Sequence, residues 1–271
     1  MGTEKRNRQK QGRQARMEAV AEQERKLRQR RTAIRVGILG LIAAVVVVLV
    51  MVLGGGDDGE QTAADDVETV TPAVVDPPEP GETLTEPAEC PPTDGSAPRV
   101  TTFTIDGLPD CLDPDAAYSA VITTNLGEMT VDLDPSTDAE ALNVFVTLAR
   151  YGYYDGSAIY GTDPGTGTIA GGAPHSNAVN DLGPGFEVPV ESGTAAPVGS
   201  LVLDLNARFR IVALATAVES RGGSVIGTLD NEALGVANSI LGLHAEAPGS
   251  LLSGAGPSQP VVVESISIVE S

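Results

Sequence analysis

An uninterrupted apolar run constrains this chain more than any other feature. Residues 36–53, VGILGLIAAVVVVLVMVL, contain no polar side chain, and three glycines follow them. A bilayer core about 30 Å thick is crossed by about 20 helical residues, whose backbone hydrogen bonds are satisfied within the helix. A buried core helix is the alternative, but such helices usually keep one polar stripe. The sequence therefore predicts a transmembrane helix that begins at Val36 and ends at Gly56.

The charges on either side of this run predict its orientation. Residues 1–35 hold 12 Lys or Arg and 4 acids, whereas the rest of the chain holds 5 Arg, no Lys and 33 acids. Positive charge close to a membrane helix stays cytoplasmic. We therefore expect residues 1–35 to be a basic cytoplasmic tail, and the residues after the helix to lie outside the cell membrane. A cleaved signal peptide would have an unusually long charged region and lacks an adjacent small-x-small cleavage site.

Composition also limits what the tail and the acidic part can do. The basic tail could lie on the anionic inner leaflet or remain a solvated anchor, and both interpretations stay open. The strongly acidic exported part repels phosphate backbones, so nucleic acid is not an expected partner. Residues 57–89 are rich in Pro, Glu, Asp and Thr, which is typical of an extended linker that cannot bury a core.

Cys90 and Cys111 are the only cysteines and both lie in the exported part. An even pair in an oxidising compartment predicts a disulfide, which would close a segment spanning residues 90–116. Two free thiols are the alternative. A metal site is not expected, because two Cys without a nearby His make an incomplete ligand set.

Alternating and helical patterns predict an α+β domain over residues 117–271. Met129, Val131 and Leu133 alternate with polar residues, which indicates one buried strand face. Thr137 and Glu140 match a capping box that opens a helix ending near Arg150. The expected strands are residues 119–124, 128–133, 200–205, 209–215, 224–229 and 261–269, and a second helix is expected at residues 231–243. In the last strand we expect Val262, Ile266 and Ile268 to face the core.

Several segments in this order resemble the cyclophilin family of peptidyl-prolyl isomerases. They are VITTNLGEMTVDLDP, ALNVFVTLARYGYYDG, DPGTGTIAGGAPH, GPGFEVP and the run VIG at residues 225–227. The region from Cys90 to Cys111 is similar to what precedes the domain in membrane-anchored bacterial cyclophilins. The resemblance implies a mostly antiparallel eight-stranded β-barrel capped by two helices and preceded by the transmembrane helix.

The resemblance also implies a site, and this chain departs from it. The family's catalytic Arg matches Gly161, and the family's Gln matches Ala170. The pocket positions fall near Gly167 and Thr168, and the strand that carries a pocket Phe aligns with Phe209 and Arg210. On this basis the expected peptide contacts are Tyr160, Thr168, Phe209 and Arg210, and the possible substitutes for the missing guanidinium are Arg208 and Arg210.

Three functions are consistent with these residues. The resemblance favours a membrane-anchored homologue that binds proline-containing or extended segments of exported polypeptides with weak or no catalysis. An active isomerase that assists folding outside the membrane is the second, and a non-catalytic docking protein with a basic partner is the third. None of them requires a cofactor or a metal, because a twisted prolyl amide is stabilised by hydrogen bonds and charge.

Overall fold

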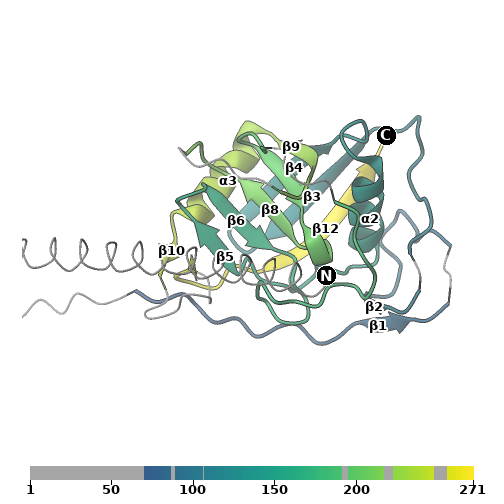
Figure 1. Ribbon diagram of the computed structural model, residues 1–271, viewed down its shortest axis with the longest axis horizontal. Coiled ribbons are helices and arrows are strands. Elements are labelled where there is room, and N and C mark those ends of the chain that lie inside the picture. Colours follow the sequence, from purple (N-terminus) through teal and green to yellow (C-terminus); the bar gives the residue numbers. More distant parts are fainter. Residues whose placement is uncertain (1–69, 87–88, 106, 191–194, 217–221, 247–254) are drawn as a thin grey trace, which may run out of the picture. The chain divides into compact units, whose positions relative to one another are not determined.

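The computed structural model describes residues 70–86, 89–105, 107–190, 195–216, 222–246 and 255–271 (Figure 1). The expected cytoplasmic tail at residues 1–35, the expected transmembrane segment at 36–56 and the linker residues 57–69 lie outside this part of the chain. Within the described ranges, no helix is both long enough and apolar enough to span a bilayer. Glu68–Ser271 forms one compact unit.

An eight-stranded antiparallel sheet forms the body of this unit, as predicted. Its strand order is β12-β3-β4-β9-β7-β8-β6-β5. The bounds are β3 Tyr118–Thr124, β4 Gly127–Leu133, β5 Gly161–Asp163, β6 Thr168–Gly171, β7 Ser200–Leu203, β8 Phe209–Val212, β9 Ser224–Leu229 and β12 Val263–Glu270. The sheet curls until its two ends meet, because Ala158 forms a bridge with Val262 and the Ile159 N–H donates to the Val261 carbonyl at 2.9 Å.

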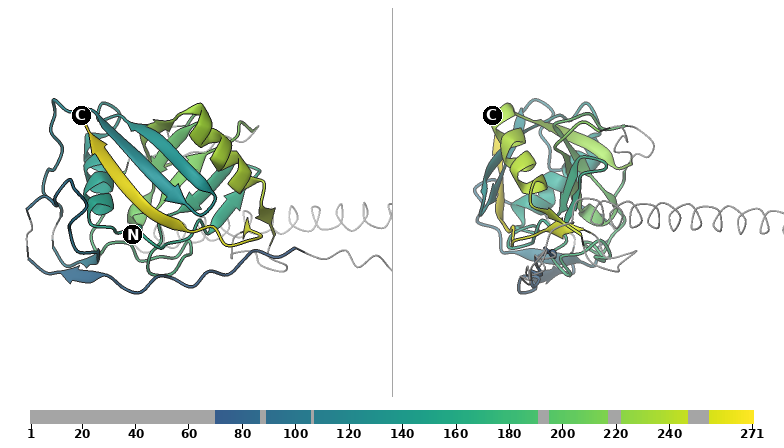
Figure 2. Two further views of the ribbon diagram at one scale, coloured as in Figure 1. Left: turned by 180° about the vertical axis from the view of Figure 1, so that it is seen from behind. Right: turned by 90° about the vertical axis from the view of Figure 1, so that its left-hand side faces the viewer.

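Two α-helices in the described residues, α2 (Ala139–Arg150) and α3 (Asn231–Leu241), lie at opposite ends of the curled sheet (Figures 1 and 2). Each helix follows an Asp whose carboxylate accepts a hydrogen bond from a backbone N–H of the first turn. The Ala141 N–H donates to Asp138 at 3.0 Å, and the Ala233 N–H donates to Asp230 at 2.7 Å. The N-cap was expected at Thr137 and lies one residue later, at Asp138.

Alternation along β3 and β4 places one face of the hairpin in the core, as the sequence predicts. Ile122, Met129 and Val131 have no exposed surface. Phe145 of α2 is equally buried and its ring lies 5.4 Å from that of Tyr154. Burial of each such side chain stabilises the folded state by about 1.5–3 kcal/mol. The core between α2 and the sheet therefore contributes much of the stability of the domain.

The last strand differs from its predicted register. The pairing of β12 with β3 shifts between Val263 and Ser265, so that Val263 faces the core and Val262 is only half-buried. The expected core position of Val262 was therefore wrong, because a bulge moves every residue before it to the opposite face. Ile266 is 4% exposed, as predicted, whereas Ile268 is half-buried. The left view of Figure 2 shows β12 running beside β3.

The described residues between 70 and 117, here called the wrapping segment, pack around the unit before the sheet begins. β1 (Glu82–Leu84) pairs in parallel with β2 (Val100–Phe103), and the predicted Cys90–Cys111 disulfide is present, with 5.4 Å between the two Cα atoms. On the opposite side, β10 (His244–Ala245) pairs with β11 (Gly256–Pro257). The second half of the expected linker thus lies against the domain.

Candidate functional site

The positions at which the sequence departs from the family pattern lie on one line across the sheet. Gly161 of β5 pairs with Ala170 of β6, which pairs with Arg210 of β8, which pairs with Val202 of β7. The next residues along these strands, including Ile169 and Ile211, are fully buried. Because side chains alternate between the two faces of a strand, the line lies on the outer face of the curled sheet.

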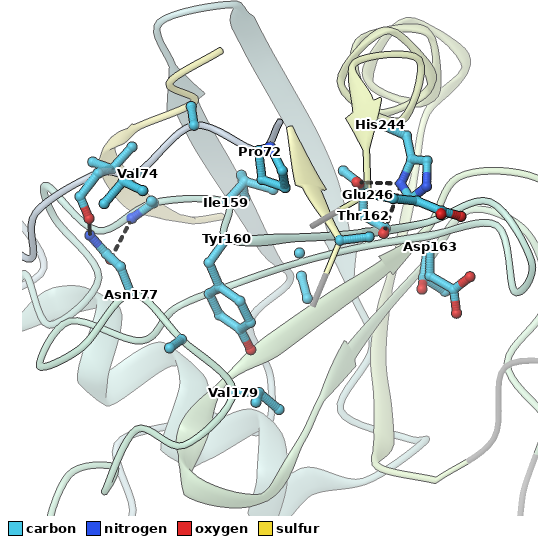
Figure 3. A pocket seen from close by; sticks show the side chains of 18 of the residues that line it. Pro72, Val74, Ile159, Tyr160, Thr162, Asp163, Asn177, Val179, His244 and Glu246 are labelled. Atoms are coloured by element: carbon cyan, nitrogen blue, oxygen red, sulfur yellow. Dashed lines mark hydrogen bonds between the residues drawn. The ribbon is translucent and has the colours of Figure 1, made fainter. Parts of the chain in front are cut away.

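A groove with a volume of about 1680 Å³ opens over one end of this line. Its floor includes Tyr160, Gly161, Thr168 and Ala170, and its walls come from residues 71–75 and from the loop at residues 176–180 (Figure 3). The walls are mainly Pro, Ala and Val, so the groove suits an extended apolar segment more than a charged one.

Tyr160 stands in the middle of the groove, between Pro72 on one side and Val179 on the other (Figure 3). Burial raises the pKa of its phenol, and the nearby positive charge of Arg208 opposes that shift only in part. The Tyr160 hydroxyl is therefore protonated at neutral pH and can donate a hydrogen bond to a ligand carbonyl. The predicted peptide contact at Tyr160 lies where a ligand could reach it.

Arg208 lies at the margin of the groove. Its Nη1 donates to the Val179 carbonyl at 2.7 Å and lies 3.5 Å from the Tyr160 hydroxyl, while its Nε donates to the Leu205 carbonyl at 3.3 Å. Two backbone carbonyls thus hold this guanidinium beside the loop at residues 176–180. To act on a ligand above Gly161, it would have to give up these bonds.

Arg210 is held more firmly. Its Nε and Nη2 contact the two carboxylate oxygens of Asp204 at 2.5 and 2.8 Å, and Nη2 also donates to the Gly222 carbonyl at 2.6 Å. A bidentate carboxylate partner fixes the orientation of a guanidinium and neutralises its charge. Neither expected substitute is therefore presented over Gly161 and Ala170.

The other two expected peptide contacts are less accessible. Phe209 has no exposed surface, and its ring lies 5.8 Å from that of Tyr154 inside the core. A ligand in the groove cannot touch it, which corrects the expectation that Phe209 binds peptide. Thr168 lies in the groove floor but is only 6% exposed, and its hydroxyl is 3.0 Å from that of Thr166.

The end of the groove opposite the loop at residues 176–180 is polar. His244, Glu246 and Asp163 lie there, and the His244 Nδ1 is 2.9 Å from the Thr162 hydroxyl (Figure 3). In the ranges that the structure describes, no group of three or more His, Cys, Asp or Glu residues is arranged to hold a metal ion. This end therefore offers hydrogen bonds and negative charge to a ligand.

Sequence reasoning missed Asn177, which joins three segments at the groove. Its Oδ1 accepts the Ala158 N–H at 2.8 Å, and its Nδ2 donates to the carbonyls of Val75 and Asp76 at 3.2 and 3.0 Å. Its φ of 47° lies in the left-handed region, which Asn tolerates better than most residues. A lone Asn in a loop gives no local sign that it contacts a segment 100 residues away.

Comparison with known proteins gives structural likenesses only. No family model and no curated protein sequence matches the chain. A cyclophilin-type peptidyl-prolyl cis-trans isomerase of Cryptosporidium parvum is similar at 17% identity and a TM-score of 0.46, over 57% of this chain and 99% of that chain. The same isomerase crystallised in the presence of the dipeptide Ala-Pro is similar at 18% identity and a TM-score of 0.44, over 56% and 99%. Likenesses at this level carry no conclusion about activity.

Proposed function

We propose that this protein is a membrane-anchored, extracytoplasmic, cyclophilin-like module that binds proline-containing or extended segments of exported polypeptides without accelerating prolyl isomerisation. One observation supports it above the others. The groove over Gly161 and Ala170 is open and mainly apolar. The two arginines beside it, Arg208 and Arg210, are both held by other partners.

The chemistry of the prolyl bond makes that observation decisive for the proposal. Rotation about a peptide bond faces a barrier of about 20 kcal/mol, because resonance gives the C–N bond partial double-bond character. A cation aimed at the prolyl nitrogen favours the twisted state, and removing a positioned group of this kind typically costs orders of magnitude in rate. A groove without such a group can still bind the peptide in its ground state.

An active isomerase is the second candidate, and Arg208 is the observation that favours it. Its Nη1 lies 3.5 Å from the Tyr160 hydroxyl, and Tyr160 lines the groove. Release of the Val179 and Leu205 carbonyls would free this guanidinium. The proposed function therefore predicts that Arg208 keeps its backbone partners when peptide binds.

The binding half of the proposal is tested with an Ala170→Leu variant of the full chain in detergent micelles. Gly161 and Ala170 face each other across β5 and β6 with little space, so Leu would fill the floor of the groove. We expect affinity for a fluorescent Ala-Pro-rich peptide to fall about tenfold or more. Ala215→Leu, at an exposed position outside the groove, is the matched control and should bind as the wild type does. Equal binding by both variants would refute the assignment.

A further inference from the structure

One wall of the groove is a strand-like segment of the chain itself. Residues 71–76, here called the strap, have the sequence TPAVVD and run along the rim beside Tyr160 (Figure 3). The Ala73 N–H donates to the Pro257 carbonyl at 2.7 Å, and the carbonyls of Val75 and Asp76 accept from Asn177 Nδ2. These three hydrogen bonds engage only the backbone of the strap, so any extended peptide could make them.

The strap packs three of its four apolar side chains against the domain and leaves the fourth in solvent. Pro72, Ala73 and Val75 are partly buried, whereas Val74 is 90% exposed. Pro72 lies close to Gly256, where an added Cβ would come within 3.5 Å of the Pro72 Cβ and 2.8 Å of the Tyr160 carbonyl. Because apolar burial contributes about 25 cal/mol per Å², these side chains add to the backbone hydrogen bonds that hold the strap. An extended peptide with a proline and small or branched apolar residues could make the same contacts.

We propose that the strap is an exchangeable internal ligand, and that an extended segment of another polypeptide takes its place on the Pro257 carbonyl and Asn177. This proposal rests on the function proposed above. The partner it fits is an extended segment with a proline followed by small or branched apolar residues, as in Pro72-Ala73-Val74-Val75. It must offer one N–H and, two and three residues later, two carbonyls.

The strap competes with such a partner by mass action. A tethered ligand acts at an effective concentration in the millimolar range, so a free peptide must exceed it in affinity or concentration. Weakening the hold of the strap should therefore tighten the binding of a peptide in trans. Weakening the receptor groups should loosen the binding of both.

A proline substitution in the strap tests this without changing the receptor groups on Pro257 and Asn177. Ala73→Pro removes the N–H that bonds to Pro257, whereas Val74→Pro in the same strap leaves that N–H in place. The probe is a fluorescent synthetic peptide with the sequence of residues 69–79, titrated against the full chain in detergent micelles. One hydrogen bond is worth about 1 kcal/mol, so Ala73→Pro should bind the probe about fivefold more tightly than the wild type. Val74→Pro should bind it within about twofold of the wild type.

A change in the receptor completes the test. Asn177→Asp keeps the oxygen that accepts from Ala158 and loses the donor to Val75 and Asp76. Added to Ala73→Pro, it should weaken probe binding about tenfold, and a probe with proline in place of its own Ala73 should bind every variant poorly. Equal affinities of Ala73→Pro and Val74→Pro, or no effect of Asn177→Asp, would overturn the proposal.

An unrelated Ala-Pro-rich peptide separates this proposal from the proposed function. If the probe follows the pattern above while the unrelated peptide binds no variant, the strap is an internal ligand and the general peptide-binding function fails. If the unrelated peptide binds the wild type and Ala73→Pro equally and is lost in Ala170→Leu, the function stands and the strap proposal is overturned.

Discussion

At the scale of single residues, the contact with Asp204 determines where the Arg210 guanidinium lies. Arg210 stands on the same cross-strand line as Gly161 and Ala170, where a cation could act on a bound prolyl bond. The bidentate contact with Asp204 neutralises that charge and fixes the side chain along the sheet. The family-derived alignment identified Arg210 as a substitute, but an alignment cannot show that a carboxylate six residues earlier already holds it.

Asp155 provides a prediction at the same scale. Burial raises the pKa of its carboxyl group, only partly opposed by the Ile266 N–H at 3.3 Å and by the charge of Arg99. A raised folded-state pKa means that the ionised group costs stability, and that this cost appears as the pH rises from the unfolded-state value of about 3.9 through the folded-state pKa.

The variant Asp155→Asn cannot ionise. We therefore expect its free energy of unfolding, relative to that of the wild type, to increase as the pH rises above about 4 and then to level off. Urea unfolding of both proteins between pH 3 and pH 8 measures this difference. A difference that is constant with pH, or that decreases as the pH rises, would contradict the account of Asp155.

Secondary-structure elements follow from the sequence where a single periodicity covers the whole element. The hairpin of β3 and β4, both helices and β9 were predicted nearly to the residue, because alternation along a strand and helical spacing are local signals. The prediction was wrong or incomplete where backbone conformation and contacts with other strands determine the bounds of an element. The strand expected at residues 200–205 ends at Leu203, since Asn206 and Ala207 adopt positive φ values of 63° and 58°. The short strands β5 and β6 carry no alternation long enough to recognise, although they form the groove floor.

Gly235 gives a prediction for α3. It lies inside the helix, its φ is ordinary, and an added Cβ would meet nothing within 4 Å. Ala is favoured over Gly in a helix interior by about 1 kcal/mol, so Gly235→Ala should raise the free energy of unfolding by up to that amount. Gly227→Ala in β9 is the contrasting control, because its Cβ would lie 2.7 Å from the Asp132 carbonyl. Thermal or urea unfolding that shows both changes destabilising would contradict this description of α3.

The wrapping segment joins distant parts of the molecule at the largest scale. Arg150 at the end of α2 pairs with Glu270 of β12 at 2.6 Å and donates to the Cys111 carbonyl at 3.4 Å. The disulfide then ties Cys111 to Cys90 beside β1 and β2. The sequence predicted the disulfide correctly, but a Pro-rich composition is the same for a free linker and for one docked on a domain. The strap could therefore not be foreseen.

Removal of the disulfide tests how much the wrapping segment contributes. In the chain-entropy model a loop of this size stabilises by about 3 kcal/mol, so the double variant Cys90→Ser, Cys111→Ser should lose about that amount. Urea unfolding of the oxidised wild type and of the variant gives the difference, and reductant should shift only the wild type. A loss well below 1 kcal/mol would show that the segment is held by its other contacts.

The central claim is that the groove binds proline-containing segments while no guanidinium acts on the prolyl bond. The most direct measurement is the rate of cis–trans isomerisation of an Ala-Pro peptide, followed by NMR exchange with the full chain in detergent micelles at a concentration that saturates binding. We predict the uncatalysed rate, unchanged in Arg208→Ala and Arg210→Ala variants. A large acceleration that either substitution abolishes would contradict the account.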